Sequence, residues 1–576
     1  MRVLYIMLQP LEYKSLTRTL IAPVSFLKEE NVCKIDFGKE WFGTIQLRLA
    51  ASPSTRSILV RLGEVLLSDG RIDRNPPGTA RFRELTFELL PEKTVHELCI
   101  PSDPDNTGVR TIKMPNHIGE VLPFRYVELE GAPSDLTWDN IYLAAVHYPY
   151  DPNASFFECP DNELNAVWEL SRHTMIATSF CGIFVDGDRE RYPREADSYI
   201  NQLGYYCVDA EYGLARHTHE FMIQHPSRWT EWLFHSIFMA WMDLLYSGDD
   251  TSARRCYADL ENKLLLPLAR DDGLISTVAP DISDDFLRSL YRYEGEHVKG
   301  DPRLVDIVDW PKGERDSYEF MDYNTVVNSF HFRSLQLLSQ IAFQIGKGAA
   351  AQRLADRAEL VQRAFQRAFF DDKQGLYVDG EGSAHASLHA NIFPLVFGLV
   401  PSAKKARVIE FIKAKKMACS VYAAQYMLEA LFCEGEAEHA LALMTADTDR
   451  SWKHMIDQDA TITFEAWDPK YKSNMDRNHA WGAAPANIIP RYVLGVRPLD
   501  IGADRIVIAP QPGSLSHVQG KVPIRHGSVL INYRAKEGGQ ACLEVEIPEG
   551  TNAGVVLGNK KATYVGAGRH IFHAVC

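Results

Sequence analysis

The sequence lacks several patterns that would assign it to a class of protein directly. It contains no run of about 18 apolar residues, so it predicts no membrane span. None of its 10 cysteines forms a CxxC pair, which argues against a structural zinc site. Cysteines this sparse are not typical of a disulfide scaffold, and we expect mostly buried free thiols.

Signatures of nucleotide binding and of serine hydrolases are also missing, because no P-loop, GxGxxG or G-x-S-x-G pattern occurs. Positive charge is scarce: 61 Lys and Arg face 76 Asp and Glu, a net charge of -15. A chain of this sign lacks the basic field that holds proteins on DNA or RNA. We therefore predict no nucleic-acid partner.

Two further features are weak. Residues 1–10 are basic and then apolar, but too short for a convincing signal peptide, so the compartment stays open between cytoplasm and periplasm. His217 and His219 lack the HExxH spacing, and His385 with His389 has no third ligand in view. We predict no metal and no other cofactor, and a homodimer is left open.

What the sequence contains falls into three zones. Residues 1–150 hold short β-branched and aromatic runs between turn clusters, which predicts a jelly-roll-like β-sandwich. Residues 151–497 repeat helical periodicity in roughly ten to thirteen segments. Strands return in residues 498–576. The order predicts a multidomain chain with an (α/α)6 barrel catalytic domain between an N-terminal and a C-terminal β-sandwich.

Two helices of the middle zone are marked by their ends. Residues 161–178 carry apolar side chains at 3/4 spacing, with Asp161 as the N-cap. Residues 329–346 repeat the pattern, with Gly346 as the stop.

The densest polar cluster lies between Asp186 and Asp197, where five carboxylates and three arginines fall in twelve residues. It follows a predicted helix, and Pro193 is placed to be the first residue of the next one. The alternative is an ordinary run of charged residues exposed to solvent. Apolar segments on both sides favour a buried loop instead, in which guanidinium groups hold carboxyl groups in a defined geometry.

Cleavage of a glycosidic bond requires two carboxyl groups across a sugar, one of them protonated. Glu465 is the second candidate, because it lies among apolar and aromatic residues rather than charges. Aromatic–acid pairs recur in the helical zone, and an aromatic ring can stack on a sugar whose hydroxyls the acid binds. The alternatives are that Glu465 lies at the rim of the fold without a catalytic role and that the tryptophans belong to the hydrophobic core.

These residues resemble glycoside hydrolase family 78, the α-L-rhamnosidases, whose signature is D-C-P-x-R-D-E-R-x-G-W-x-G-D. Glu190 and Arg191 match its E-R, and Asp197 matches its last Asp. Glu465-Ala466-Trp467 matches a second motif, E-x-W, and Asp309-Trp310 resembles a G-D-W segment. The similarity extends over nearly the whole chain.

The resemblance implies an exo-acting, inverting enzyme that removes terminal α-L-rhamnose from a rhamnose-containing carbohydrate. Glu190 would be the general acid and Glu465 the general base. The implied substrate-binding residues are Asp186, Arg189, Asp197, Trp229, Glu231, Trp232, Asp309, Trp310, Trp467, His479 and Trp481.

The motif around Asp186 to Arg194 also departs from the family. Phe184 stands where its first Asp would be, Arg189 replaces its second Asp, and Pro193-Arg194 replaces G-W. This predicts a divergent subgroup, and an added arginine would favour a substrate with a carboxylate or sulfate. The alternatives are a same-fold glycosidase for another deoxy or uronic-acid-linked sugar, a non-catalytic carbohydrate-binding relative, and a polysaccharide lyase. The paired glutamates argue against the last two.

Overall fold

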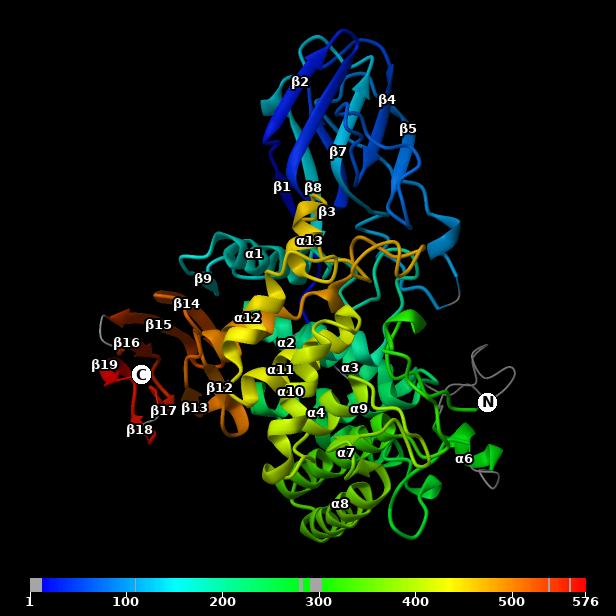
Figure 1. The fold of residues 1–576 in the computed structure, drawn as a ribbon. Helices are drawn as coiled ribbons and strands as arrows, with labels where there is room; N and C mark the ends of the chain where they lie inside the picture. Colours follow the sequence, from blue (N-terminus) through cyan, green and yellow to red (C-terminus); the bar gives the residue numbers. More distant parts are fainter. Residues whose placement is uncertain are drawn as a thin grey trace.

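The computed structural model describes residues 13–108, 110–278, 283–290, 303–536, 539–558 and 561–575. The expectations about residues 1–10 and about Cys576 concern residues outside these ranges. A sheet-rich N-terminal region lies at the top of a helical body in Figure 1, and a second sheet-rich region lies at the left of that body. Among the described helices, none combines the length and apolar character needed to cross a membrane.

The N-terminal region is built around one long strand, β3 (Val32–Arg48). Its register against β7 shifts between Asp36 and Trp41, and such a bulge bends a strand. Cys33, Ile35 and Phe37 alternate with less buried neighbours, as expected for one face of a sheet. The order in this sheet is β1 (Thr17–Ile21), β8 (Ile141–His147), β3, β7 (Leu122–Glu130), β4 (Arg56–Gly63) and β5 (Phe82–Leu89), with β2 (Ser25–Glu29) and β6 (Val95–Glu97) also on β3.

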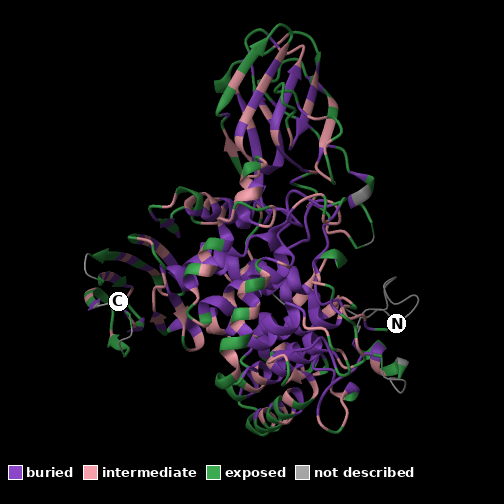
Figure 2. Cartoon of the chain, in the orientation of Figure 1, coloured by how far each residue is buried: buried purple, intermediate pink, exposed green. Residues whose placement is uncertain are grey.

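Six helices of the described chain form a closed inner ring, in which each packs against the next and the last against the first. Every residue of α2 is buried, as expected for a helix inside a larger body (Figure 2). The ring runs through α2 (Glu195–Val208), α4 (Thr230–Ser247), α7 (Thr325–Gln344), α9 (His389–Val396), α11 (Val421–Cys433) and α14 (Pro485–Ile488).

A second set of helices covers the ring from outside. These helices are amphipathic: α8 buries one face and exposes the other. They are α1 (Asn162–Ala177), α3 (Gly213–Gln224), α5 (Thr251–Asn262), α8 (Gly348–Phe369), α10 (Ser402–Lys415) and α12 (Ala437–Met444). The short helices α6 (Asp284–Ser289) and α13 (Trp452–Asp457) lie outside this pairing.

The helix ends test the expectations from the sequence. Asp161 caps α1 as predicted, since its side chain accepts hydrogen bonds from the backbone of Glu163 and Leu164. Helix α7 begins earlier than predicted, at Thr325, because Asn324 caps it. Pro193 as the first residue of α2 is wrong: the helix begins at Glu195, after a cap position at Arg194.

The C-terminal region consists of two sheets, one of which takes a strand from before the barrel. Of the described cysteines all are free and most are buried, as predicted. The domain boundaries expected from the sequence, 1–150, 151–497 and 498–576, stay a prediction. One sheet has the order β12 (Val496–Pro498), β13 (Arg505–Ile508), β17 (Asn552–Val555) and β18 (Thr563–Val565), and the other β19 (Gly568–Val575), β16 (Gln540–Ile547), β15 (Gly527–Lys536), β14 (His517–Ile524) and β9 (Phe156–Glu158).

Candidate active site

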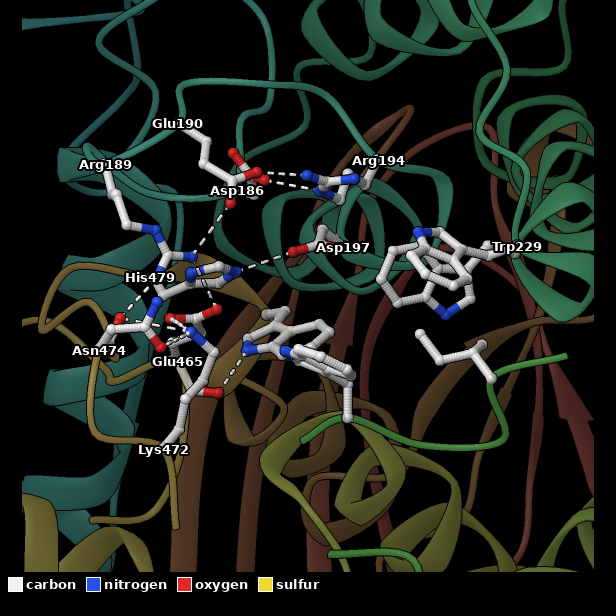
Figure 3. A pocket seen from close by; sticks show the side chains of 14 residues that line it. Asp186, Arg189, Glu190, Arg194, Asp197, Trp229, Glu465, Lys472, Asn474 and His479 are labelled. Carbon is white, nitrogen blue, oxygen red and sulfur yellow. Dashed lines mark hydrogen bonds and ion pairs between the residues drawn. The ribbon is translucent and has the colours of Figure 1, made fainter. Parts of the chain in front are cut away.

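A cavity of about 250 Å³ lies where several inner helices begin. The loops before α2 and α14, the beginning of α4 and the segment between α6 and α7 all reach it, so residues far apart in sequence meet there (Figure 3). Its lining consists of Asp186, Arg189, Glu190, Arg194, Asp197, Trp229, Trp232, Ile307, Trp310, Glu465, Lys472, Asn474, His479 and Trp481.

The loop before α2 is closed by the buried carboxylate of Asp186. Its Oδ1 accepts from the backbone N–H of Tyr192 at 2.8 Å, and its Oδ2 accepts from Nε of Arg194 at 2.7 Å. Gly187 has φ +81°, and a Cβ there would lie 2.5 Å from Oδ2 of Asp476. The turn therefore needs glycine, and it presents the following residues to the cavity.

The N-terminal region holds this loop from behind. Asp188 is buried and forms ion pairs with Arg191 and with Arg81, which precedes β5. Its backbone N–H donates to Oδ1 of Asn478 at 3.0 Å, and Nδ2 of Asn478 donates to Oε1 of Glu64 at 2.9 Å. One network thus joins both acid-bearing segments of the barrel to the first sheet.

Glu190 projects into the cavity between two guanidinium groups. It forms an ion pair with Arg194, and its Oε1 lies 3.4 Å from Nη2 of Arg189. Burial raises the pKa of Glu190, but the charges of Arg194 and Arg189 outweigh it and lower the pKa to about 2. In this arrangement Glu190 is ionised at neutral pH.

The pKa of Asp186 is shifted in the direction opposite to that of Glu190. Burial raises the pKa of Asp186 well above its usual range; Arg194 opposes this shift, while Glu190 adds to it. The pKa values of two neighbouring carboxyl groups are therefore shifted in opposite directions, a pattern found at sites of acid–base chemistry.

Glu465 lies opposite Glu190 and is almost fully buried. Its Oε1 lies 3.2 Å from Nη2 of Arg189, and its Oε2 lies 3.1 Å from Nζ of Lys472. Burial raises the pKa of Glu465, but the charges of His479, Arg189 and Lys472 outweigh it, so the pKa is lowered. One arginine nitrogen therefore contacts both carboxylates, and their Oε1 atoms cannot lie farther apart than 3.4 Å and 3.2 Å added together.

His479 binds acids on both sides. Its Nε2 lies 2.8 Å from Oδ1 of Asp197, and its Nδ1 lies 3.8 Å from Oδ2 of Asp476. Burial lowers its pKa, but these two carboxylates outweigh burial and raise the pKa to about 10. Glu465, Asp476 and His479 have ligand atoms within 4.8 Å of one another. Glu465 is already paired with Arg189 and Lys472, however, and His479 with Asp197.

Tryptophans form an apolar wall of the cavity. The rings of Trp232 and Trp481 meet edge to face with centroids 6.3 Å apart, and Trp229 packs against Trp232 at 5.9 Å. Nε1 of Trp481 donates to the backbone carbonyl of Glu465 at 2.9 Å, which ties the wall to this acid. Flat apolar faces of this kind suit the C–H face of a sugar ring.

Two predicted sugar-binding acids, Glu231 and Asp309, do not line the cavity. The carboxylate of Glu231 accepts from the backbone N–H groups of Ile307 and Val308, both at 2.9 Å. Asp309 is fully buried and faces away, toward His389. Both therefore hold the segment that carries Ile307 and Trp310 into the lining.

Trp467 also lies outside the lining. It is fully buried, its Nε1 donates to the carbonyl of Cys419 at 2.7 Å, and its ring packs edge to face on Trp452.

Four lining residues were not among the sequence candidates: Arg194, Ile307, Lys472 and Asn474. Arg194 stands inside the charged cluster, so the cluster itself was a usable signal. Lys472 and Asn474 follow Glu465 in a polar loop, and Nζ of Lys472 donates to Oδ1 of Asn474 at 2.8 Å. No periodicity marks them, because a loop places its side chains by tertiary contacts.

Comparison with known families decides the affiliation. A model of the bacterial α-L-rhamnosidase six-hairpin glycosidase domain matches residues 152–493, and one of the bacterial α-L-rhamnosidase C-terminal domain matches residues 495–572. The chain belongs to the bacterial α-L-rhamnosidase family. The predicted family and the (α/α)6 barrel between two sheet-rich regions are thereby confirmed.

Individual rhamnosidase relatives are distant and longer. An α-L-rhamnosidase of Alteromonas sp. is 23% identical over 232 residues, which are 37% of this chain and 24% of that protein. One of Formosa agariphila is 25% identical over 246 residues, 41% and 26% respectively. The chain thus matches only about a quarter of each.

Solved rhamnosidase structures share the fold. The α-L-rhamnosidase of Dictyoglumus thermophilum has a TM-score of 0.75 at 19% identity, covering 96% of this chain and 63% of its own. That of Aspergillus terreus has a TM-score of 0.76 at 19% identity, covering 97% and 64%. At these identities the likeness concerns the fold alone, and this chain spans less than two thirds of either.

Proposed function

We propose that this protein removes terminal α-L-rhamnose from oligosaccharides, polysaccharides or glycosides by single-displacement hydrolysis that inverts the anomeric centre. The observation that carries the proposal is the pairing of Glu190 and Glu465 across one cavity, with a single guanidinium between them. Inverting glycosidases hold their two carboxyl groups about 6.5–9.5 Å apart. The contacts with Arg189 limit the Oε1 atoms of Glu190 and Glu465 to the short end of this range. A cavity of about 250 Å³ suits one sugar ring, which supports removal of a terminal residue.

In the proposed reaction Glu190 gives its proton to the glycosidic oxygen as the bond from that oxygen to the anomeric carbon breaks. Glu465 takes a proton from a water whose oxygen bonds to that carbon from the opposite face. The products are free β-L-rhamnose and the protonated aglycone. Transfer of the proton from Glu465 to solvent and reprotonation of Glu190 complete the cycle.

The charges fit Glu465 as the base, because its lowered pKa keeps it ionised. Glu190 has to gain a proton, although Arg194 and Arg189 hold it ionised. We infer that a sugar entering between the carboxylates displaces Arg189, which removes one cation and raises the pKa of Glu190. The neighbouring Asp186 accepts from Nε of Arg194 and so holds that guanidinium beside Glu190.

The remaining lining residues take supporting roles in the proposal. Asp186 and Asp197 bind sugar hydroxyls, and the imidazolium of His479 keeps Glu465 ionised. Trp229, Trp232, Trp310 and Trp481 contact the ring. Glu231, Asp309 and Trp467 act as positioning residues.

The test is a panel of 4-nitrophenyl glycosides offered to the purified protein. We expect turnover of the α-L-rhamnoside and little of the α-L-fucoside or β-D-glucuronide. Preferred cleavage of another glycoside would favour a same-fold glycosidase for a different sugar. Binding of rhamnose without turnover of any member would favour a non-catalytic relative, and an unsaturated product would indicate a lyase.

A further inference from the structure

Two arginines that do not line the cavity stand beside its mouth on the side of Glu190. Arg110 and Arg228 are both exposed. The segment with Arg110 runs along the acid loop: Oγ1 of Thr111 donates to the carbonyl of Glu190 at 3.2 Å. Arg110 therefore lies next to the turn that carries the proposed acid.

Arg228 approaches the same place from the segment before α4. The backbone N–H of Ser227 donates to Oε1 of Glu195 at 2.9 Å, which brings this segment against the residue that follows Arg194. Cζ of Arg228 lies 5.4 Å from the ring centroid of Trp229, which lines the cavity. We call Arg110, Arg194 and Arg228 the arginine rim.

Two of the three rim arginines, Arg110 and Arg228, carry positive charge that no ion pair within the described chain neutralises. Arg194 is paired with Asp186 and Glu190, but no described carboxylate forms an ion pair with Arg110 or Arg228. The pKa of Arg110 is lowered, first by partial burial and further by the charges of Arg194 and Arg228, which Tyr192 and Glu190 only partly oppose.

The nearby acids Glu190 and Glu195 form no ion pair with Arg110 or Arg228 among the described residues. Glu190 is held by Arg189 and Arg194, and Glu195 is buried with Oε1 bound to the backbone of Ser227. Guanidinium groups in this condition are suited to bind an external anion in a bidentate manner.

We propose that the arginine rim binds a carboxylate or sulfate group on the sugar from which rhamnose is removed, so that the substrate is a rhamnosyl linkage to an acidic sugar. The inference rests on the proposed function, which places the leaving oxygen beside Glu190. The leaving sugar then projects from the cavity past Trp229, with its anionic group at Arg110 and Arg228.

The test compares kcat/KM for three α-L-rhamnosyl disaccharides of one linkage, ending in glucuronate, sulfated glucose or glucose. We expect an anionic substrate to exceed the neutral one by about tenfold or more at low ionic strength, with the preference falling as salt rises. The two anionic arms decide between carboxylate and sulfate. The double variant Arg110→Gln/Arg228→Gln is expected to bring the ratio close to one. The matched control Arg363→Gln, on the exposed face of α8, leaves it unchanged.

Equal kcat/KM for all three disaccharides would contradict the proposed anion binding by the arginine rim. A preference for anionic substrates that survives in the double variant would contradict it as well. Failure of the proposed function looks different, because then no disaccharide and no aryl rhamnoside is cleaved. The rim is in that case tested by calorimetric binding of D-glucuronate and D-glucose. Tighter binding of glucuronate that the double variant loses supports it, and equal binding of the two sugars refutes it.

Discussion

Nη2 of Arg189 lies 3.2 Å from Oε1 of Glu465, in the gap that separates this carboxylate from Glu190. The same nitrogen is 3.4 Å from Oε1 of Glu190, so one cation lowers the pKa of both groups. Hydrolysis by the proposed route needs Glu465 ionised and Glu190 protonated. Arg189 therefore sets both limbs of the pH profile.

We predict that Arg189→Gln moves the whole profile of kcat/KM to higher pH. Loss of the cation raises the pKa of Glu465, which shifts the acidic limb upward, and raises that of Glu190, which shifts the basic limb upward. Lys472→Gln is the matched comparison, because Lys472 pairs with Glu465 and not with Glu190 among the described ion pairs. It is expected to move the acidic limb alone. Unchanged limbs in Arg189→Gln would show that this residue does not control the two acids.

The two glutamates should respond differently to the leaving group. Glu190→Gln and Glu465→Gln are each expected to lower kcat for 4-nitrophenyl α-L-rhamnoside by about 10²–10⁴-fold. A 2,4-dinitrophenyl leaving group needs no proton, so it should restore much of the rate in Glu190→Gln and little in Glu465→Gln. Circular dichroism of both variants checks the fold. Equal recovery in both variants would contradict the assignment of acid and base.

Asp309 is expected to matter through the segment it holds. Its Oδ1 accepts from the backbone N–H of Trp310 at 2.8 Å and its Oδ2 from that of Ser420 at 3.0 Å. In Asp309→Asn the amide nitrogen faces one of these donors in either orientation, and the lost hydrogen bond costs about 1–3 kcal/mol. We predict a lower melting temperature and a higher KM, with a smaller effect on kcat.

The control for Asp309→Asn is Glu359→Gln, whose side chain is 72% exposed on α8. This change should leave the melting temperature and KM near the wild-type values. If Asp309→Asn melted like the wild type but lost kcat, Asp309 would act on the substrate rather than on the segment.

His479 should make stability depend on pH. Its pKa in the folded protein is raised to about 10, against an ordinary value of 6.5, so the stabilisation is complete below pH 6.5 and is lost as the pH rises toward 10. We predict that His479→Gln lowers the melting temperature more at pH 6 than at pH 9, as followed by calorimetry. His570→Gln, which replaces a half-buried histidine of β19, should stay close to the wild type at both pH values. An equal loss at the two pH values for His479→Gln would mean that the imidazole is uncharged.

Local signals in the sequence were sufficient for the fold and for much of the site. The apolar spacing and Asp161 predicted α1, and the charged cluster predicted the loop that bears Glu190. The direction of individual carboxylates could not be predicted this way. Asp309 is adjacent to the lining residue Trp310, yet its side chain faces His389, because both residues lie in an irregular bend in which Val308 has φ +64°. The position of Arg189 against Glu465 depends on a contact across 276 residues, which no local pattern encodes.

The most direct test of the proposed mechanism is the anomeric configuration of the first product. Proton NMR of an α-L-rhamnoside during hydrolysis by the wild-type protein separates the two anomers before mutarotation mixes them. The pairing of Glu190 and Glu465 across the cavity predicts that β-L-rhamnose appears first and α-L-rhamnose follows. Initial release of α-L-rhamnose would contradict single displacement by these two residues.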